Sequence, residues 1–224
     1  MRRSRAYNTI MHIPDGFLDT KTWVALTAVS GTAIAVSLKQ TSKTLGEKQV
    51  PVMGITAAFI FAAQMINFPV AGGTSGHFMG GVLAAILLGP FTALLVMATV
   101  LIIQCLIFQD GGVTALGANI FNMGIIGAFG GYFIFSVLRK IMKSNKGFFV
   151  SAFSAAWLSI VIAAAACSLE LSFSGTVPLK TSLIAMTGVH ALIGIGEGLI
   201  TVAVLSFIKK TRPDLLGGRT DQTD

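Results

Sequence analysis

The chain has 224 residues, of which 54% are hydrophobic and only 11% are charged, and its mean hydropathy is +0.80. Ordinary soluble domains carry about 25% charged residues, so a soluble fold could not bury this much apolar surface. The net charge of +7 does not require a nucleic-acid partner, because basic residues also gather in the cytoplasmic loops of membrane proteins. We therefore expect an integral membrane protein in a lipid bilayer, with no nucleic acid.

Long apolar runs follow one another along the chain, and a helix needs about 20 such residues to cross a membrane. The run from Met79 to Phe108 is too long for one helix, and Gly89-Pro90 at its centre breaks it into two spans, the first short. Because the runs are continuous, they disfavour a β-barrel, whose strands alternate. The sequence predicts an all-α bundle of about seven transmembrane helices, at Trp23–Leu38, Val52–Phe68, the two halves of Met79–Phe108, Val113–Leu138, Phe148–Leu171 and Ser182–Ile208.

Lysines and arginines fall mainly on one side of these spans, and that side is expected to be cytoplasmic. The opposite side carries Lys21, Lys180 and the arginines of the first ten residues. We therefore expect the N-terminus outside and the C-terminus in the cytoplasm. The basic residues on the expected cytoplasmic side are Lys39, Lys43, Lys48, Arg139, Lys140, Lys143, Lys146, Lys209, Lys210, Arg212 and Arg219.

The first ten residues, MRRSRAYNTI, lack the apolar run of a secretory signal and place three arginines against the charge rule. We interpret residues 1–10 as an extension that is not part of the functional chain, with translation starting at Met11. Residues 11–210 are expected to form one membrane domain, and residues 211–224 a cytoplasmic tail. No soluble segment is long enough to hold a core of its own.

Two of the three histidines, His12 and His77, are expected on the same, outer side of the membrane. His12 lies in MHIPDGFLD, where Pro14 and Gly16 predict a turn that can fold back onto the bundle. His77 lies in the glycine-rich segment AGGTSGHFMGG. Two imidazoles on adjacent loops suit Ni²⁺, Co²⁺, Cu²⁺ or Zn²⁺. The alternatives are solvated or structural loop histidines, and phosphate binding is disfavoured because the Lys-Ser/Thr ending of a P-loop is missing.

His190 and Glu197 lie two turns apart on one face of the last predicted span, in HALIGIGEGLIT. Burying a charge in the membrane is costly, so this pair is expected either to tie helices together or to act in metal binding or gating. Other polar residues near the outer ends of the spans could orient a histidine. These further candidates are Ser75, Gln104, Asp110, Asn119 and Asn122, with loop capping as the alternative for Asp110 and Asn119.

The strings MHIPDGFL, GGTSGHFMGG, DGGVTALGANIFNMG and GIGEGLIT resemble the CbiM/NikM family, the substrate-capture subunits of energy-coupling-factor cobalt and nickel transporters. The resemblance extends from Met11 to Lys210. It implies a planar nitrogen site built from the free α-amino group of Met11, the amide nitrogen and imidazole of His12, and the imidazole of His77. If the chain began at Met1, the nitrogen of Met11 would be a peptide amide and one ligand would be lost.

The resemblance also implies a function, the substrate-specific component of an ATP-driven importer that binds Ni²⁺ or Co²⁺ outside a prokaryotic cell membrane. No catalytic site and no resident cofactor are expected. ATP-binding partner subunits would supply hydrolysis, since the chain has no Walker motif. The other expected partners are a transmembrane coupling subunit and, as an option, a small accessory membrane subunit. The alternative class is a membrane-embedded metal-dependent enzyme, although HALIG and GHFMG both lack the residues of an HExxH helix.

Overall fold

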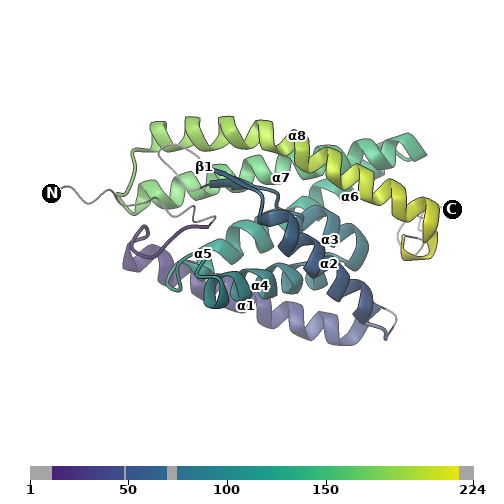
Figure 1. The fold of residues 1–224 in the computed structure, drawn as a ribbon, viewed down its shortest axis with the longest axis horizontal. Coiled ribbons are helices and arrows are strands. Elements are labelled where there is room, and N and C mark those ends of the chain that lie inside the picture. The colour runs from purple at the N-terminus through teal and green to yellow at the C-terminus, as the bar shows by residue number, and fades with distance from the viewer. Residues whose placement is uncertain (1–11, 48, 70–74, 217–224) are drawn as a thin grey trace.

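The computed structural model describes residues 12–47, 49–69 and 75–216, and it folds them almost entirely into helices. The long helices run along one axis of the molecule, with a small β-hairpin near one end (Figure 1). The predicted ligand Met11 and residues 1–10 lie outside the described residues. In chain order the elements are α1 (Thr20–Thr44), α2 (Gln49–Gln64), β1 (Asn67–Pro69), β2 (Ser75–His77), α3 (Gly81–Leu88), α4 (Pro90–Ile107), α5 (Leu116–Ile120), η1 (Phe121–Gly130), α6 (Gly131–Ile141), α7 (Asn145–Phe173), α8 (Leu179–Thr211) and η2 (Pro213–Leu215).

The helices turn apolar side chains outward, as a lipid environment requires. On α1 the buried residues are the polar Ser30, Ser37 and Thr41, whereas Val29 and Val36 are exposed. Five helical stretches are long and apolar enough to cross a membrane, namely α1, α4, the continuous α5–η1–α6, α7 and α8. The predicted class, a helical membrane protein with several spans, is therefore confirmed.

The predicted break within the long apolar run is confirmed at the predicted residues. α3 ends at Leu88 and α4 begins with Pro90, while Gly89 between them has φ +90°, a value that favours glycine. α3 has only eight residues, too few to cross a bilayer alone. Because all but one of its residues are buried in protein, its backbone does not need to reach water at both ends.

Two predicted helices differ in the structure. The second predicted span runs to Phe68, but α2 ends at Gln64 and the chain enters strand β1, which pairs antiparallel with β2 so that Asn67 lies opposite His77. The predicted helix from Val113 to Leu138 begins at Leu116, and its middle is the ten-residue π-helical stretch η1. The apolar residues of η1 itself form no marked stripe, so sequence periodicity carries no signal for this change of winding.

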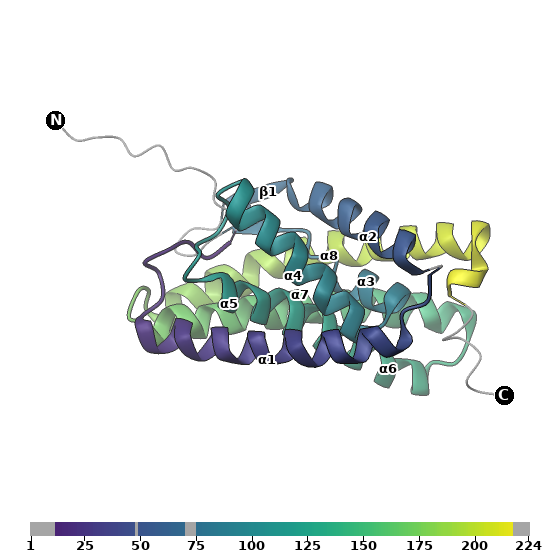
Figure 2. The same ribbon diagram turned by 90° about the horizontal axis from the view of Figure 1, so that it is seen from below.

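α3 lies at the centre of the bundle, where it packs against α4, η1, α6 and α7 (Figure 2). The contact with η1 is backbone to backbone, because a Cβ on Gly81 would lie 2.8 Å from the nitrogen of Ala128. α7 and α8 form a long antiparallel pair beside it. This arrangement places the turn from β2 into α3, and therefore His77, inside the bundle.

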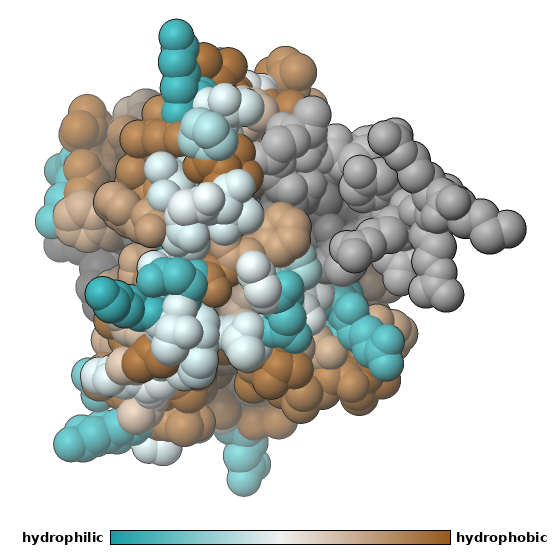
Figure 3. All heavy atoms as spheres, turned by 90° about the vertical axis from the view of Figure 1, so that its left-hand side faces the viewer, coloured by the Kyte–Doolittle hydropathy of each residue, from teal (hydrophilic) through white to brown (hydrophobic). Residues whose placement is uncertain are grey.

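The connections divide between two ends of the molecule (Figures 1 and 2). We call one the hairpin end; it carries the β-hairpin, the segment before α1, the α4–α5 turn and the α7–α8 turn. Viewed from this side, hydrophilic and intermediate side chains gather across the middle of the face (Figure 3). We call the other the basic end; it carries the α1–α2 and α6–α7 connections and the end of α8, with Lys43, Arg139, Lys140, Lys209 and Lys210 in the last turns of the helices that end there.

Candidate metal centre

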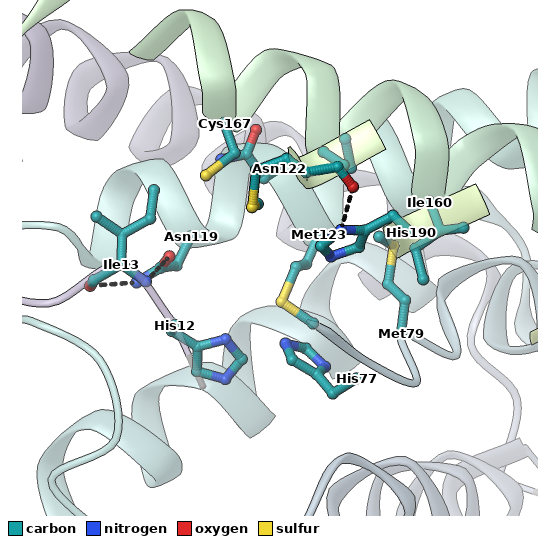
Figure 4. A pocket seen from close by; sticks show the side chains of 13 residues that line it. His12, Ile13, His77, Met79, Asn119, Asn122, Met123, Ile160, Cys167 and His190 are labelled. Atoms are coloured by element: carbon teal, nitrogen blue, oxygen red, sulfur yellow. Dashed lines mark hydrogen bonds between the residues drawn. The ribbon is translucent and has the colours of Figure 1, made fainter. Parts of the chain in front are cut away.

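The two loop histidines meet at the hairpin end, inside the protein. The ring centres of His12 and His77 lie 4.9 Å apart, with the planes at 86° (Figure 4). His12 is 4% exposed and His77 is 9% exposed, so neither is a solvated loop residue. The segment before α1 brings the first, and the end of strand β2 brings the second.

The segment that carries His12 is held in place by the α4–α5 turn and α5. Asn119 accepts a hydrogen bond from the nitrogen of Ile13 (3.0 Å) and donates one to its carbonyl oxygen (3.2 Å). The nitrogen of Gly112 donates to the same carbonyl (2.9 Å), and Asp15 accepts from the nitrogen and the hydroxyl of Thr114. These bonds satisfy a buried backbone that lies outside any helix, and they fix the position of the neighbouring His12.

Each ring is held through one of its two nitrogens. Nδ1 of His77 lies 2.8 Å from the carbonyl oxygen of Phe78. A carbonyl only accepts, so Nδ1 carries the proton and Nε2 keeps the lone pair that a metal ion needs. Nε2 of His12 lies 2.9 Å from Oε1 of Gln104.

Burial keeps both imidazoles neutral at ordinary pH. Desolvation lowers the pKa of His12 to about 4, with the hydrogen bond to Gln104 acting in the opposite direction. Desolvation and then the charge of His12 lower the pKa of His77 to about 3, against smaller raising effects that include Asp110. Neutral imidazole is the form that binds metal, so at neutral pH no proton has to leave these rings before an ion binds.

A cavity of about 60 Å³ lies against both rings. One water fills roughly 10–15 Å³ of such a volume, so the space has room for a metal ion together with a few waters. His190 also lines the cavity, and its Nδ1 lies 2.7 Å from the carbonyl oxygen of Met186. Much of the remaining wall is apolar or carries sulfur, including Met79, Met123 and Cys167 (Figure 4).

The other predicted site residues differ in how they lie relative to the cavity. Asn119 and Asn122 line the cavity, and Gln104 contacts His12 from behind. Asp110 is buried and its nitrogen donates to the carbonyl of Gln104. Ser75 begins strand β2, and its side chain is not among the described parts of the chain.

His190 and Glu197 both lie on α8, but their side chains contact different parts of the protein. Glu197 does not line the cavity; it is 2% exposed and accepts hydrogen bonds from the nitrogens of Met79 (2.7 Å) and Gly80 (2.8 Å). It therefore ties α8 to the turn that follows His77.

Gln64 and Glu170 are buried polar residues that contact predicted site residues and were not themselves predicted from the sequence. Gln64 ends α2 and bonds Gln104, and Glu170 accepts a hydrogen bond from Asn122 (2.8 Å). One oxygen of Glu170 and the amide oxygen of Asn122 are buried without a partner. An amide or a carboxylate inside an apolar run is the signal that could have identified both, since each side chain needs a buried partner.

Among the described residues, no group of three or more His, Cys, Asp or Glu side chains is arranged to hold a metal ion. Two neighbouring neutral imidazoles are present instead. A metal site built on them needs further ligands of another kind, and main-chain nitrogen atoms next to His12 are the nearest source by sequence.

Residues 12–215 match the family described as cobalt uptake substrate-specific transmembrane region, CbiM. A putative fused nickel transport protein NikMN of Archaeoglobus fulgidus is 44% identical over 208 residues, which cover 92% of this chain and 68% of the relative. The cobalt transport protein CbiM of Sorangium cellulosum is 36% identical over 216 residues, covering 92% of this chain and 94% of the relative. A crystal structure of a truncated transition metal transporter superposes with a TM-score of 0.84 at 34% identity, covering 89% of this chain and 99% of that one.

Proposed function

The chain belongs to the CbiM family of cobalt uptake transmembrane proteins, and from this premise we propose that it captures Ni²⁺ or Co²⁺ at the hairpin end for import. It is a multi-pass membrane component of cobalt and nickel transport, a transport protein and not an enzyme, in line with its relatives. The membrane-embedded enzyme raised as the alternative finds no support among these relatives.

The proposed ligands are the α-amino nitrogen of Met11, the amide nitrogen and Nδ1 of His12, and Nε2 of His77. The observation that carries the proposal is the buried pair of neutral imidazoles, 4.9 Å between ring centres, on the wall of a small cavity. The amine and amide nitrogens of adjacent residues close a five-membered chelate ring, which favours square-planar Ni²⁺ or Co²⁺. Intrinsic affinities favour Ni²⁺ over Co²⁺.

A free amine at residue 11 requires that the functional chain begin there. We accordingly propose residues 1–10 as an extension outside the functional protein, 11–210 as the metal-capture domain and 211–224 as a cytoplasmic tail. In support, the family match begins at residue 12.

The hairpin end is proposed to face outside, with about seven membrane crossings if α2 and α3 each count as one. The basic end then faces the cytoplasm, in agreement with the charge rule. Import against a gradient requires an energy source, so we propose a transmembrane coupling subunit and ATP-binding subunits as partners, with a small accessory membrane subunit as an optional one.

Metal titration of the purified protein tests the site. The chain beginning at Met11 should bind one Ni²⁺, with the visible band and the diamagnetism of a square-planar complex. His12→Ala and His77→Ala should each abolish this species, and the chain beginning at Met1 should lose it too. His190→Ala, a matched change at the same cavity, should retain it. Undiminished binding in His12→Ala and His77→Ala would overturn the site assignment, and N-terminal sequencing of the native protein would check the start.

A further inference from the structure

A row of hydrogen bonds runs behind the candidate site and joins four separate segments of the chain. Nε2 of Gln64, on α2, donates to the carbonyl oxygen of Met79 (2.9 Å). Nε2 of Gln104, on α4, donates to Oε1 of Gln64 (2.9 Å), and Oε1 of Gln104 lies 2.9 Å from Nε2 of His12. Both glutamines are 0% exposed, so water does not compete for these bonds.

The direction of this row is fixed at one end. The carbonyl of Met79 can only accept, so the amide of Gln64 must turn its NH₂ group toward it. Oxygen Oε1 of Gln64 then faces Gln104, so Gln104 must donate to this oxygen through its own NH₂ group. This leaves Oε1 of Gln104 facing His12, and an oxygen in that place accepts only from a ring nitrogen that carries a proton.

We propose that Gln64 and Gln104 form an oriented amide relay that holds His12 as the tautomer protonated on Nε2. In this tautomer the lone pair is on Nδ1, the ring nitrogen nearest the backbone of His12. Only Nδ1 can chelate an ion together with the backbone nitrogen of the same residue. Gln64 and Gln104 are thus positioning residues, and they act on the ion through His12.

The relay also links the two ligand-bearing loops. It starts on Met79, two residues after His77, and the nitrogen of Met79 is itself bonded to Glu197 on α8 (2.7 Å). When the turn after His77 is in place, Gln64 is oriented and His12 presents the correct nitrogen. When that turn is displaced, Gln64 loses its fixed acceptor, and both amides are free to reverse. The site therefore assembles as a unit.

This inference rests on the proposed metal site for its consequence, but the tautomer itself can be measured without metal. ¹⁵N NMR of histidine-labelled, metal-free protein at neutral pH distinguishes the two neutral forms. We expect His12 to carry its proton on Nε2 in the wild-type chain. A proton on Nδ1 would overturn the relay, whatever the metal titration shows.

Two substitutions that nearly keep the size of the Gln104 side chain distinguish the effect of its hydrogen bonds from the effect of its packing. In Gln104→Glu one carboxylate oxygen still accepts from Nε2 of His12, so Nε2 should keep its proton. The other oxygen now faces Oε1 of Gln64, so Ni²⁺ affinity should fall although the tautomer is kept. In Gln104→Met nothing accepts, so we expect a mixture of tautomers and a loss of Ni²⁺ affinity of roughly 10–100-fold, the usual effect of removing a group that orients a ligand. Gln64→Met should give an intermediate mixture, because Gln104 is then free to reverse.

Gln40→Met, at an exposed glutamine of α1, is the control for the chemical change and should behave as wild type. A single Nε2-protonated tautomer together with wild-type affinity in Gln104→Met would refute the relay. If the wild-type protein shows the expected tautomer but binds neither Ni²⁺ nor Co²⁺, the relay stands as a property of the fold and the proposed function fails.

Discussion

At the residue scale, the histidines of the cavity share one design: each is held through a ring nitrogen by a group of the protein. His77 and His190 use Nδ1 against backbone carbonyl oxygens, and His12 uses Nε2 against an amide oxygen. The other nitrogen keeps its lone pair, and burial keeps the rings of His12 and His77 neutral. The rings therefore do not have to reorganise when an ion arrives, which is the usual benefit of groups that orient ligands.

Asn119 offers a test of how much the backbone around His12 contributes. Asn119→Asp keeps the acceptor for the nitrogen of Ile13 but replaces the donor by an oxygen that faces the carbonyl of Ile13. We expect this repulsion to shift the segment and lower Ni²⁺ affinity by roughly 10–100-fold, measured by calorimetry on the chain beginning at Met11.

Asn145→Asp supplies the control for this prediction. It makes the same chemical change at the basic end, where Oδ1 of Asn145 accepts from Lys209 and an acceptor is all that is needed. Equal affinity in Asn119→Asp and Asn145→Asp would show that the Ile13 segment does not position the ligand.

The sequence could predict the residues on the loops better than those behind them. His12 and His77 stood out because histidine is rare in the chain and the expected topology put both on one side. Gln64 and Glu170 were missed, since a single polar residue in an apolar run shows its role only through a partner distant in sequence. Their partners, Gln104 and Asn122, lie 40 and 48 positions away.

At the element scale, helix breaks were predictable and helix contacts were not. The Gly89-Pro90 break follows from local chemistry, because proline is tolerated in the first turn of a helix but breaks a helix in its interior. The hairpin of β1 and β2 and the π-helical stretch η1 depend on neighbours far along the chain, such as the close approach of Gly81 to η1. No local pattern of residues encodes such an approach.

The crossing of α1 and α5 is a close contact that can be tested. A Cβ on Gly117 would lie 2.4 Å from the Cα of Thr27, so Gly117→Ala must push two backbones apart. We expect a destabilisation of about 1–3 kcal/mol, the range for overpacking, seen as a lower midpoint of thermal unfolding in detergent. The displacement also moves Asn119, two residues on, so Ni²⁺ affinity should fall.

Gly31→Ala is the matched control for this crossing. It lies on α1 itself, and a Cβ there meets nothing within 4 Å. Because alanine favours a helix over glycine by about 0.5–1 kcal/mol, this variant should be slightly more stable than wild type. The two alanine substitutions are thus expected to have opposite signs, and a shared sign would contradict the packing argument.

At the scale of the whole molecule, composition alone predicted that the chain lies in a lipid bilayer. The fold shows how its polar and apolar side chains are distributed in that environment. Apolar side chains face outward on α1 while Ser30, Ser37 and Thr41 face inward, the reverse of a soluble helix. Among the buried polar residues, the three histidines and the two asparagines line the cavity toward the hairpin end. Most basic residues of the described chain lie at the opposite end, so the two ends of the molecule differ in charge.

The last prediction is that the hairpin end faces outside and the basic end faces the cytoplasm, as the positive-inside rule indicates. Lys180 lies exposed at the hairpin end and Lys143 lies exposed at the basic end, so each can be replaced by cysteine in a chain lacking Cys105 and Cys167. A membrane-impermeant maleimide should label Lys180→Cys in intact cells and Lys143→Cys only after the membrane is opened. The reverse pattern would place the candidate metal centre on the cytoplasmic side, where it could not capture an ion for import.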